Sequence, residues 1–271
     1  MNLEGARAVI TGAGSGLGRA LCLELARYKA QVLVSDWDLS SAEQTARQVE
    51  QAGGKALVQA CDVTKPEQVE ALAEAAFSRL GGVDLLVNNA GVACGGEVGE
   101  LPLEEWKRVL DVNLWGVIHG CHVFVPRLRK QGSGHILNIA SAAGLMSVGY
   151  LAPYSVSKAG VVSLSETLYL ELKPAGIGVT VACPTFFRTN IATAASLYND
   201  PKLTQAANKL VNEARVEADT VARKCLRAVV HGARYALPIA DGRWAWRLKR
   251  LSPDAFLYGT YLFQKRFMKE K

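Results

Sequence analysis

Short apolar runs alternate along most of the chain with longer stretches whose apolar residues lie three or four positions apart. The short runs are rich in Val, Ile, Leu and Ala, as buried strands are. The longer stretches have the period of amphipathic helices, as Leu21, Leu25 and Tyr28 illustrate within the segment 19–28. The short runs predict strands at about 7–11, 31–35, 56–60, 84–88, 134–140, 177–182 and 234–238.

Alternating strands and helices predict an α/β fold, a single doubly wound parallel sheet of about seven strands with helices on both faces. Ligands of such sheets bind beyond the carboxyl ends of the strands, where the strand order reverses. Asn88, Ser141 and Pro184 each end or follow an expected strand. We therefore expect these three residues at the ligand-binding edge.

Two of the expected helices carry a signature at their start. Ser40–Glu43 and Thr64–Glu67 both have the capping-box pattern, in which a Ser or Thr side chain accepts a hydrogen bond from a free backbone N–H. The pattern predicts Ser40 and Thr64 as the N-cap residues.

A glycine-rich segment, Thr11–Gly18, joins the first expected strand to the first helix. Glycines allow a backbone to approach a pyrophosphate closely, and free N–H groups at a helix N-terminus face its negative charge. The spacing of Gly12, Gly16 and Gly18 differs from the Gly-x-Gly-x-x-Gly fingerprint of many dinucleotide sites. Asp36 ends the second strand eighteen residues after Gly18, near the offset of a carboxylate that holds ribose hydroxyls. The segment therefore predicts a dinucleotide-binding turn.

Tyr154 and Lys158 stand four residues apart, with Ser141 upstream. On a helix this spacing places both side chains on one face, one turn apart. A phenol has a free pKa of about 10 and exchanges protons poorly near neutral pH. Because a nearby ammonium favours the phenolate, we expect Lys158 to lower the pKa of Tyr154. The pair predicts acid/base chemistry near neutral pH.

Taken together, these motifs resemble the short-chain dehydrogenase/reductase family, in the correct order and over roughly residues 5–240. The resemblance implies a Rossmann-like fold and a nicotinamide-dependent reaction at a CH–OH group. It implies that Asn113, Ser141, Tyr154 and Lys158 form the catalytic set. The cofactor-binding residues that it implies are Gly12, Ser15, Gly16, Leu17, Gly18, Asp36, Asp62, Val63, Asn89, Ala90, Gly91, Tyr154, Lys158, Pro184 and Thr189.

The resemblance also implies a role for each catalytic residue. Tyr154 exchanges a proton with the substrate oxygen, while Ser141 donates a hydrogen bond to that oxygen. Lys158 holds the nicotinamide ribose, and Asn113 holds a water that links Lys158 to solvent. From the residues alone, Asn113 could equally satisfy backbone groups inside its helix, and Ser141 could be a turn residue.

The sequence around Asp36 favours NAD over NADP. A carboxylate accepts hydrogen bonds from a ribose hydroxyl and repels a 2′-phosphate, by about 4 kcal/mol for unit charges at 4 Å in an effective dielectric of 20. NADP-preferring relatives usually place a basic residue next to this carboxylate or before the second glycine of the motif. This chain has Trp37 and Ser15 at those positions. We expect Arg19, the nearest basic residue, on a helix surface.

Two loops are expected to flank the substrate, one of them a lid at about 186–215. Thr185 follows Pro184 where the family usually has Gly, which bears on the backbone path beside the nicotinamide. Apolar residues in the loops favour an apolar substrate, although several of them could equally belong to the core. They are Leu145, Met146, Val148, Phe186, Phe187, Leu197 and Tyr198.

Length and composition indicate one catalytic domain, 1–242, and a tail, 243–271. No apolar run reaches the roughly 18–20 residues that span a membrane, and the N-terminus lacks the features of a secretory signal. Six cysteines without a Cys-x-x-Cys pair favour reduced thiols, so we expect a cytoplasmic protein. No set of Cys, Asp or Glu residues near His119 and His122 completes a metal site, and we expect none.

The tail holds the whole net charge of the chain. Eight of the 31 Lys and Arg residues lie in 243–271 against two of the 25 Asp and Glu residues, which accounts for the formal charge of +6. Seven aromatic residues share this stretch, and 255–268 could form an apolar helix. Three interpretations remain open: a peripheral membrane contact, a subunit contact and a docking site for an acidic partner. The neutral remainder of the chain argues against nucleic-acid binding.

These features favour an NAD-dependent oxidoreductase that transfers a hydride between nicotinamide and a secondary alcohol or ketone. We expect a lipophilic substrate, of the steroid, retinoid or fatty acyl type, and a homodimer or homotetramer as in the family. The alternatives are an enzyme similar to 3-oxoacyl carrier-protein reductases and a non-catalytic, nucleotide-responsive binding protein. The intact catalytic set favours an enzyme, since a binding module has no physical need for a tuned phenol.

Overall fold

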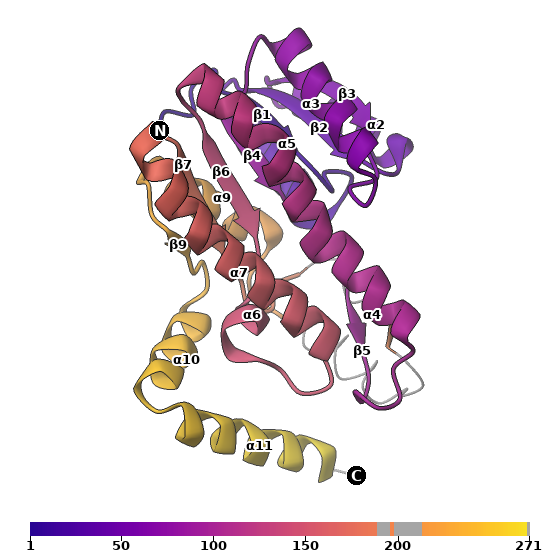
Figure 1. The fold of residues 1–271 in the computed structure, drawn as a ribbon, viewed down its shortest axis with the longest axis vertical. Helices are drawn as coiled ribbons and strands as arrows, with labels where there is room; N and C mark the ends of the chain where they lie inside the picture. The colour runs from indigo at the N-terminus through magenta and orange to yellow at the C-terminus, as the bar shows by residue number, and fades with distance from the viewer. Residues whose placement is uncertain (189–195, 198–212, 270–271) are drawn as a thin grey trace.

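A parallel sheet in the order β3-β2-β1-β4-β6-β7-β9 forms the centre of the structure (Figure 1). The computed structural model describes residues 1–188, 196–197 and 213–269. The seven expected strands are all present, each within two residues of its expected bounds. They are β1 (Arg7–Ile10), β2 (Gln31–Asp36), β3 (Lys55–Ala60), β4 (Leu85–Asn88), β6 (His135–Ile139), β7 (Gly178–Ala182) and β9 (Tyr235–Ala236).

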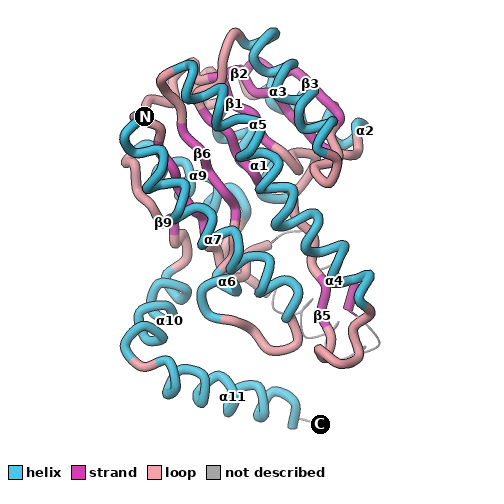
Figure 2. The backbone as a smooth tube through the Cα atoms, viewed as in Figure 1, coloured by secondary structure: helices cyan, strands magenta, loops and turns pink. Residues whose placement is uncertain are grey.

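Helices cover both faces of the sheet, as the alternation predicts. One buried cluster joins the sheet to α1 (Gly16–Ala26), α2 (Leu39–Gln51) and α9 (Ala218–Val230). A second joins it to α3 (Pro66–Leu80), α5 (Gly116–Gln131) and α7 (Ala152–Leu172), of which α5 and α7 cross the near face in Figure 2. The doubly wound α/β class is therefore confirmed.

The strand order reverses at β1. Ile10 of β1 is paired with Val34 of β2 on one side and with Val87 of β4 on the other. The chain leaves β1 toward β2 and leaves β4 toward β6, so the two following loops diverge. This divergence opens the crevice in which doubly wound sheets bind their ligands.

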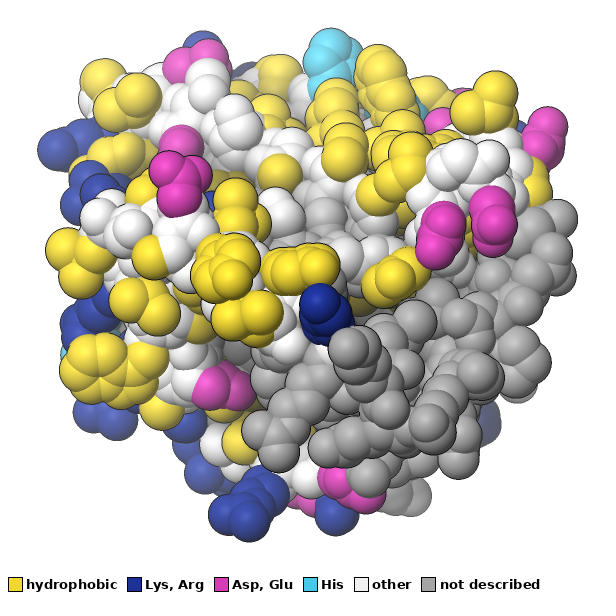
Figure 3. Space-filling view, turned by 90° about the horizontal axis from the view of Figure 1, so that it is seen from below, with side chains coloured by type: hydrophobic (Ala, Val, Ile, Leu, Met, Phe, Trp, Pro, Cys, Tyr) yellow, Lys and Arg dark blue, Asp and Glu magenta, His cyan; other side chains and the backbone are white. Residues whose placement is uncertain are grey.

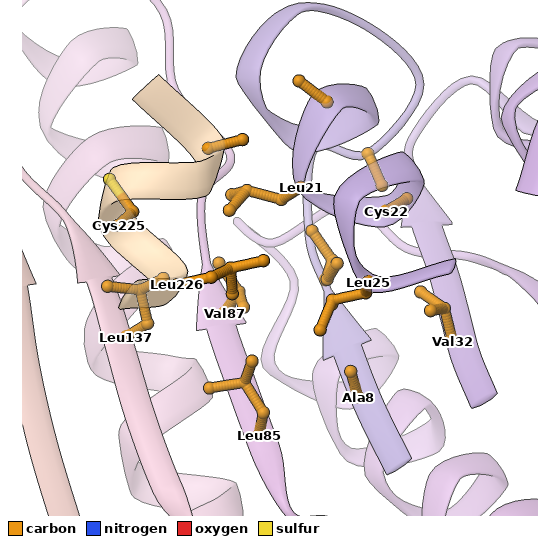
Figure 4. Packing of buried hydrophobic residues seen from close by; sticks show 14 of the residues in the cluster. Ala8, Leu21, Cys22, Leu25, Val32, Leu85, Val87, Leu137, Cys225 and Leu226 are labelled. Atoms are coloured by element: carbon orange, nitrogen blue, oxygen red, sulfur yellow. The ribbon is translucent and has the colours of Figure 1, made fainter. Parts of the chain in front are cut away.

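Leucine side chains of α1 and α9 pack against one another and against the strands, which holds both helices on the sheet (Figure 4). Leu21 and Leu25 are fully buried, and Leu226 of α9 lies over Val87 and Leu137 of the strands. Burying such a side chain contributes about 1.5–3 kcal/mol. The packing fixes the start of α1, and with it the glycine-rich turn, relative to β1 and β4.

Both expected N-caps were wrong. The cap of α2 is Asp38, whose carboxylate accepts a hydrogen bond from the Ser40 backbone N–H at 3.0 Å. The capping-box pattern missed this because a carboxylate two residues earlier reaches the same donors. The cap of α3 is Lys65, without a side-chain bond, because Pro occupies the first helical position and fixes the entry there. Thr64 instead donates its hydroxyl to Asp62 at 2.8 Å.

One long helical stretch consists of α4 (Leu103–Leu110), the π-helical turn η1 (Asp111–Trp115) and α5. This stretch, Leu103–Gln131, is the one described helix with the length and composition of a membrane-crossing segment. Its contacts with α3 and α7 place it against the sheet as a core helix. Asn113 lies inside this π-helical turn.

Four further elements lie at the carboxyl end of the sheet or beyond it. Two of them, β5 (Cys94–Gly95) and β8 (Ser196–Leu197), form a short parallel pair that the hydrophobic pattern did not predict. The other two, α10 (Ala240–Leu251) and α11 (Pro253–Lys269), extend away from the body of the molecule (Figures 1 and 2). An apolar helix was expected at 255–268, and α11 confirms it.

Candidate active site

The glycine-rich turn is packed so tightly that side chains do not fit. A Cβ at Gly18 would lie 2.2 Å from the carbonyl oxygen of Gly12, and a Cβ at Gly12 would lie 2.6 Å from the Cα of Ala90. Gly12 also has a positive φ of 62°, which favours glycine. The turn therefore keeps the start of α1 open to a phosphate group, as a dinucleotide requires.

Hydrogen bonds join this turn to the end of β4. The Asn89 side chain donates to the carbonyl oxygens of Thr11 and Gly12, both at 2.9 Å. The Thr11 hydroxyl accepts from the backbone N–H groups of Asn89 and Ala90, at 3.0 and 3.3 Å. The two loops that diverge at the strand-order reversal are thus held as one unit. Thr11 was not among the expected site residues, although it opens the glycine motif.

Asp36 closes the turn from the β2 side. One carboxylate oxygen accepts the Gly14 backbone N–H at 2.8 Å, and the other accepts the Asp38 backbone N–H at 3.1 Å. Arg19 is held by the Gly14 carbonyl oxygen and by the Thr45 hydroxyl, the latter at 3.0 Å. The carboxylate therefore faces the cavity as a fixed negative charge, and the nearest cation is engaged elsewhere.

Tyr154 and Lys158 lie one turn apart near the start of α7, as their spacing predicts. The ammonium nitrogen of Lys158 is 5.8 Å from the centre of the Tyr154 ring and donates to the Ile139 carbonyl oxygen at 2.9 Å. Ser141 follows β6 and caps α6 (Ala142–Met146), accepting the Ala143 backbone N–H at 3.2 Å. Three residues from the segment that follows β6, one at the start of α6 and two in α7, thus meet at one edge of the sheet.

Burial controls the protonation of this pair. It raises the pKa of Tyr154, while a hydrogen bond with Ser141 acts in the opposite direction. The pKa of the phenol is thus raised, and not lowered as expected from Lys158, because burial disfavours the phenolate. Burial also lowers the pKa of Lys158 to about 8. The lysine can therefore change its protonation within the range in which the site would exchange protons.

Asn113 is fully buried, and its side-chain amide bonds to the segment of the same chain that follows β4. Its oxygen accepts from the Val92 backbone N–H at 2.8 Å, and its nitrogen donates to the Val92 carbonyl oxygen at 2.9 Å. The same nitrogen donates to the Ser157 hydroxyl at 3.1 Å, and Ser157 in turn donates to the Tyr154 carbonyl oxygen at 2.7 Å. Asn113 thus satisfies backbone groups outside its own helix. Ser157 was not predicted as a site residue, although it lies between Tyr154 and Lys158 in the sequence.

These elements line one cavity of about 850 Å³. It runs from the glycine turn and Asp36 to Tyr154 and Lys158, and Trp37 and Arg108 also line it. Neither was predicted as a site residue from the sequence. Trp37 could have been, because it directly follows Asp36. The other expected catalytic and cofactor-binding residues that line this cavity are Gly12, Ser15, Gly16, Leu17, Asp62, Val63, Asn89, Ala90, Gly91, Ser141 and Pro184.

Two expected site positions, Asn113 and Gly18, do not line the cavity. Gly18 lies below the turn, against Gly12, and acts through the shape of the backbone. Thr189 lies outside the described residues, as do Tyr198 and much of the expected lid at 186–215. Among the described residues, no cluster of three His, Cys, Asp or Glu side chains could hold a metal ion.

Thr185, at the position where the family usually has Gly, lies in the loop after β7. Its hydroxyl donates to Asp241 at 2.8 Å, and its methyl group lies against Gly242, where a Cβ would be 2.7 Å away. Thr185, Phe186 and Phe187 all line the cavity. The extra side chain thus connects the cavity wall to α10.

Comparison with known proteins agrees with this arrangement. The model of the short chain dehydrogenase family matches residues 6–200. The chain is 42% identical over 183 residues to "Probable oxidoreductase EphD" of Mycobacterium tuberculosis (strain ATCC 25618 / H37Rv), covering 67% of this chain and 31% of that protein. The chain therefore matches less than a third of the length of that relative.

A second relative is similar over most of its length. It is 3beta-hydroxysteroid dehydrogenase 1 of Eggerthella lenta, 37% identical over 212 residues, which cover 78% of this chain and 80% of the relative. Among solved structures, a short chain dehydrogenase/reductase from Burkholderia phymatum in complex with NAD has a TM-score of 0.89 and 34% identity. That match covers 94% of this chain and 96% of the other.

Proposed function

The chain belongs to the short-chain dehydrogenase family, and from that premise we propose that it is an NAD-dependent oxidoreductase acting on secondary alcohols and ketones. The observation that carries the proposal is the meeting of Ser141, Tyr154 and Lys158 in the cavity that also contains the glycine turn. When bound, the nicotinamide supplies the chemistry of hydride exchange. A proton-exchanging group and a dinucleotide cradle in one cavity are what that chemistry requires.

The protein's own residues handle the proton. Tyr154 donates its phenolic proton to the substrate oxygen in ketone reduction and accepts one in alcohol oxidation. The Ser141 hydroxyl donates a hydrogen bond to the same oxygen and stabilises the negative charge that develops there. Lys158 places an ammonium 5.8 Å from the phenol ring, where its charge favours the deprotonated state.

Asn113 acts as a positioning residue in this proposal. It holds Val92, which follows the β4 edge, and it holds Ser157, which is bonded to the Tyr154 backbone. Both sides of the reaction centre are thereby kept at a fixed separation. A displacement of about 1 Å at such a centre can reduce the rate about 10²-fold.

Asp36 supports NAD as the cofactor. Its carboxylate is fixed by two backbone N–H groups and lines the cavity, so it can accept hydrogen bonds from a ribose diol. A 2′-phosphate would meet this negative charge. The NAD complex of the Burkholderia phymatum relative agrees with this assignment.

The walls of the cavity beyond Tyr154 support a lipophilic substrate. The side chains there are apolar and come from the segments after β6 and β7, and a cavity of about 850 Å³ has room for a bulky molecule beside a dinucleotide. The named activity of the Eggerthella lenta relative is that of a steroid dehydrogenase. The walls comprise Met146, Val148, Leu151, Phe186 and Phe187.

Turnover with NAD across secondary alcohols graded from short chains to sterols tests the proposal. We expect kcat/KM to rise with the apolar size of the substrate. Tyr154→Phe should reduce kcat by about 10²–10⁴-fold and leave NAD binding intact. The matched control is Tyr169→Phe, which alters a tyrosine of the same helix outside the cavity. Full turnover by Tyr154→Phe would refute the mechanism, and activity restricted to small polar alcohols would refute the lipophilic substrate.

A further inference from the structure

The exposed face of α10 is apolar along its whole length. Trp244, Leu248 and Leu251 are 69%, 53% and 83% exposed. They stand at positions i, i+4 and i+7, so they form a single stripe on the helix. A stripe of this kind is normally buried against another element. The start of α11 lies beside Leu248, whereas Trp244 and Leu251 remain mostly exposed.

The face continues on α11. Its exposed apolar side chains again recur at helical spacing, and its remaining contacts are with α10, around Phe256 and Thr260. Figure 3 views the molecule from this end and shows hydrophobic side chains gathered on the face, with Lys and Arg along one edge. Among the side chains of α11 that the structure describes, the exposed apolar ones are Leu257, Tyr258, Tyr261 and Leu262.

A second stripe, of cations, runs beside the apolar one. Arg243, Arg247 and Arg250 each precede a residue of the apolar stripe by one position. Arg247 lies over the Trp244 ring at 5.4 Å, and Lys265 lies over the Tyr261 ring at 5.8 Å. Arg247 and Lys265 thus face solvent together with these rings. Arg243 instead donates to the Leu237 carbonyl oxygen, and Arg250 lies over the Trp246 ring.

Specific contacts fix this face to the body of the protein. Trp246, on the opposite side of α10, stacks on Tyr235 with ring centres 5.2 Å apart. Tyr235 in turn donates to Glu166 of α7. Lys249 donates to the Leu145 carbonyl oxygen of α6 at 2.9 Å. The exposed face is therefore held in a defined orientation.

We propose that the face formed by α10 and α11 docks the protein on an anionic phospholipid bilayer. Aromatic rings and leucines enter the boundary between headgroups and acyl chains, while arginine and lysine side chains meet the lipid phosphates. The segment 243–271 carries eight basic residues against two acidic ones, Asp254 and Glu270. That surplus is complementary to a surface of anionic lipids.

The same charges oppose pairing with a second copy of the chain. A two-fold contact brings a surface patch against its own copy, so the basic residues of both copies would lie in one interface. Like charges at such an interface are unfavourable. An apolar strip without flanking cations would favour a dimer, and this strip has Arg247 and Lys265 beside its rings.

Docking at this face would bring the bilayer close to the cavity. Lys249 contacts α6 next to Met146, which lines the cavity, and Asp241 contacts Thr185 in the loop after β7. A lipophilic substrate could then enter from the bilayer without crossing water. This consequence rests on the proposed function, whereas the docking itself does not.

Flotation of the full-length protein with vesicles tests the proposal. One set of vesicles contains equal parts of phosphatidylglycerol and phosphatidylcholine, and the other contains phosphatidylcholine alone. We expect flotation with the anionic set and a bound fraction that falls with salt. Trp244→Ser/Leu251→Ser and Arg247→Gln should each lower the bound fraction at least about threefold. The matched controls lie on α2 at the far end of the molecule, Leu39→Ser and Arg47→Gln, and should not change it.

Three results would overturn the docking proposal. One is the absence of flotation with anionic vesicles at low salt. Another is a loss of oligomer size in Trp244→Ser/Leu251→Ser without vesicle binding by the wild type, which would assign the face to a second copy. The last is binding to an acidic carrier protein in place of vesicles. Turnover of a water-soluble secondary alcohol without vesicles should be unchanged in these variants, which separates a failure of docking from a failure of the proposed reaction.

Discussion

The Thr185 hydroxyl donates a hydrogen bond of 2.8 Å to the carboxylate of Asp241. This bond joins the loop after β7, which lines the cavity, to the first turn of α10. A glycine at position 185, the usual residue of the family here, could not make it. The threonine thereby couples the cofactor side of the cavity to the C-terminal helices.

Replacing Thr185 with Val should loosen this connection. Valine keeps the shape and the contact with Gly242 but loses the bond to Asp241, so we expect stability to fall by about 0.5–1.5 kcal/mol. Hydrogen exchange in α10 should accelerate. Thr185→Ser keeps the hydroxyl and is the control. Equal exchange in both variants would show that the hydroxyl does not anchor the helix.

Removing the charge of Asp36 should weaken the preference for NAD. Asp36→Asn can still accept the Gly14 backbone N–H, so the turn is preserved while the negative charge is lost. We expect the ratio of kcat/KM for NAD to that for NADP to fall about tenfold, which corresponds to about 1.4 kcal/mol. Glu43→Gln, on the exposed side of α2, changes the net charge equally and should leave the ratio unchanged. An unaltered ratio in Asp36→Asn would remove Asp36 from cofactor selection.

Truncating Asn113 should destabilise the protein as well as slow it. Asn113→Ala leaves both half-buried backbone groups of Val92 without their partner, so we expect a loss of about 2–4 kcal/mol in the free energy of unfolding. Ser157→Ala removes one bond of the same network and should cost less. Urea unfolding of both variants measures the difference. A larger loss in Ser157→Ala would contradict the positioning role of Asn113.

A side chain at Gly18 should disturb the dinucleotide turn. Because a Cβ there would lie 2.2 Å from the Gly12 carbonyl oxygen, Gly18→Ala must displace the turn. We expect a cost of about 1–3 kcal/mol in stability and at least about tenfold weaker NAD binding, since the backbone N–H groups of the turn move away from the phosphates. Isothermal titration measures the binding. Gly99→Ala, where nothing lies within 4 Å of the new Cβ, is the control.

Acid should destabilise the fold through His135. Burial lowers the pKa of His135 from 6.5 to about 4, and its ring lies 2.8 Å from the Thr180 hydroxyl. Between these two values the unfolded chain binds a proton that the folded protein does not, so stability falls as pH falls from 6.5 toward 4. The slope contributed by this residue is at most about 1.4 kcal/mol per pH unit.

Unfolding measured between pH 7 and pH 4 checks this expectation. His135→Gln should show a shallower decline than the wild type, although it is less stable at neutral pH. His122→Gln, at an exposed position on α5, should keep the wild-type slope. Identical slopes for His135→Gln and the wild type would show that other groups cause the acid sensitivity.

The sequence by itself determined the features that depend on local spacing. The short apolar runs predicted every strand of the main sheet, because a strand covered on both faces of the sheet is apolar throughout, and the helices were predicted from their period. Gly12 and Gly18 could be read as a phosphate turn, and Tyr154 and Lys158 as a pair on one helix face. Each of these inferences concerns residues less than ten positions apart.

Tertiary structure decided the features that depend on contacts distant in the chain. The partners of Asn113, the bond from Thr185 to Asp241 and the packing of Trp246 on Tyr235 join separate elements, and no local pattern encodes them. The pKa of Tyr154 belongs to the same class. Spacing places an ammonium near the phenol, but the burial that raises the pKa arises only when the whole fold closes around the ring.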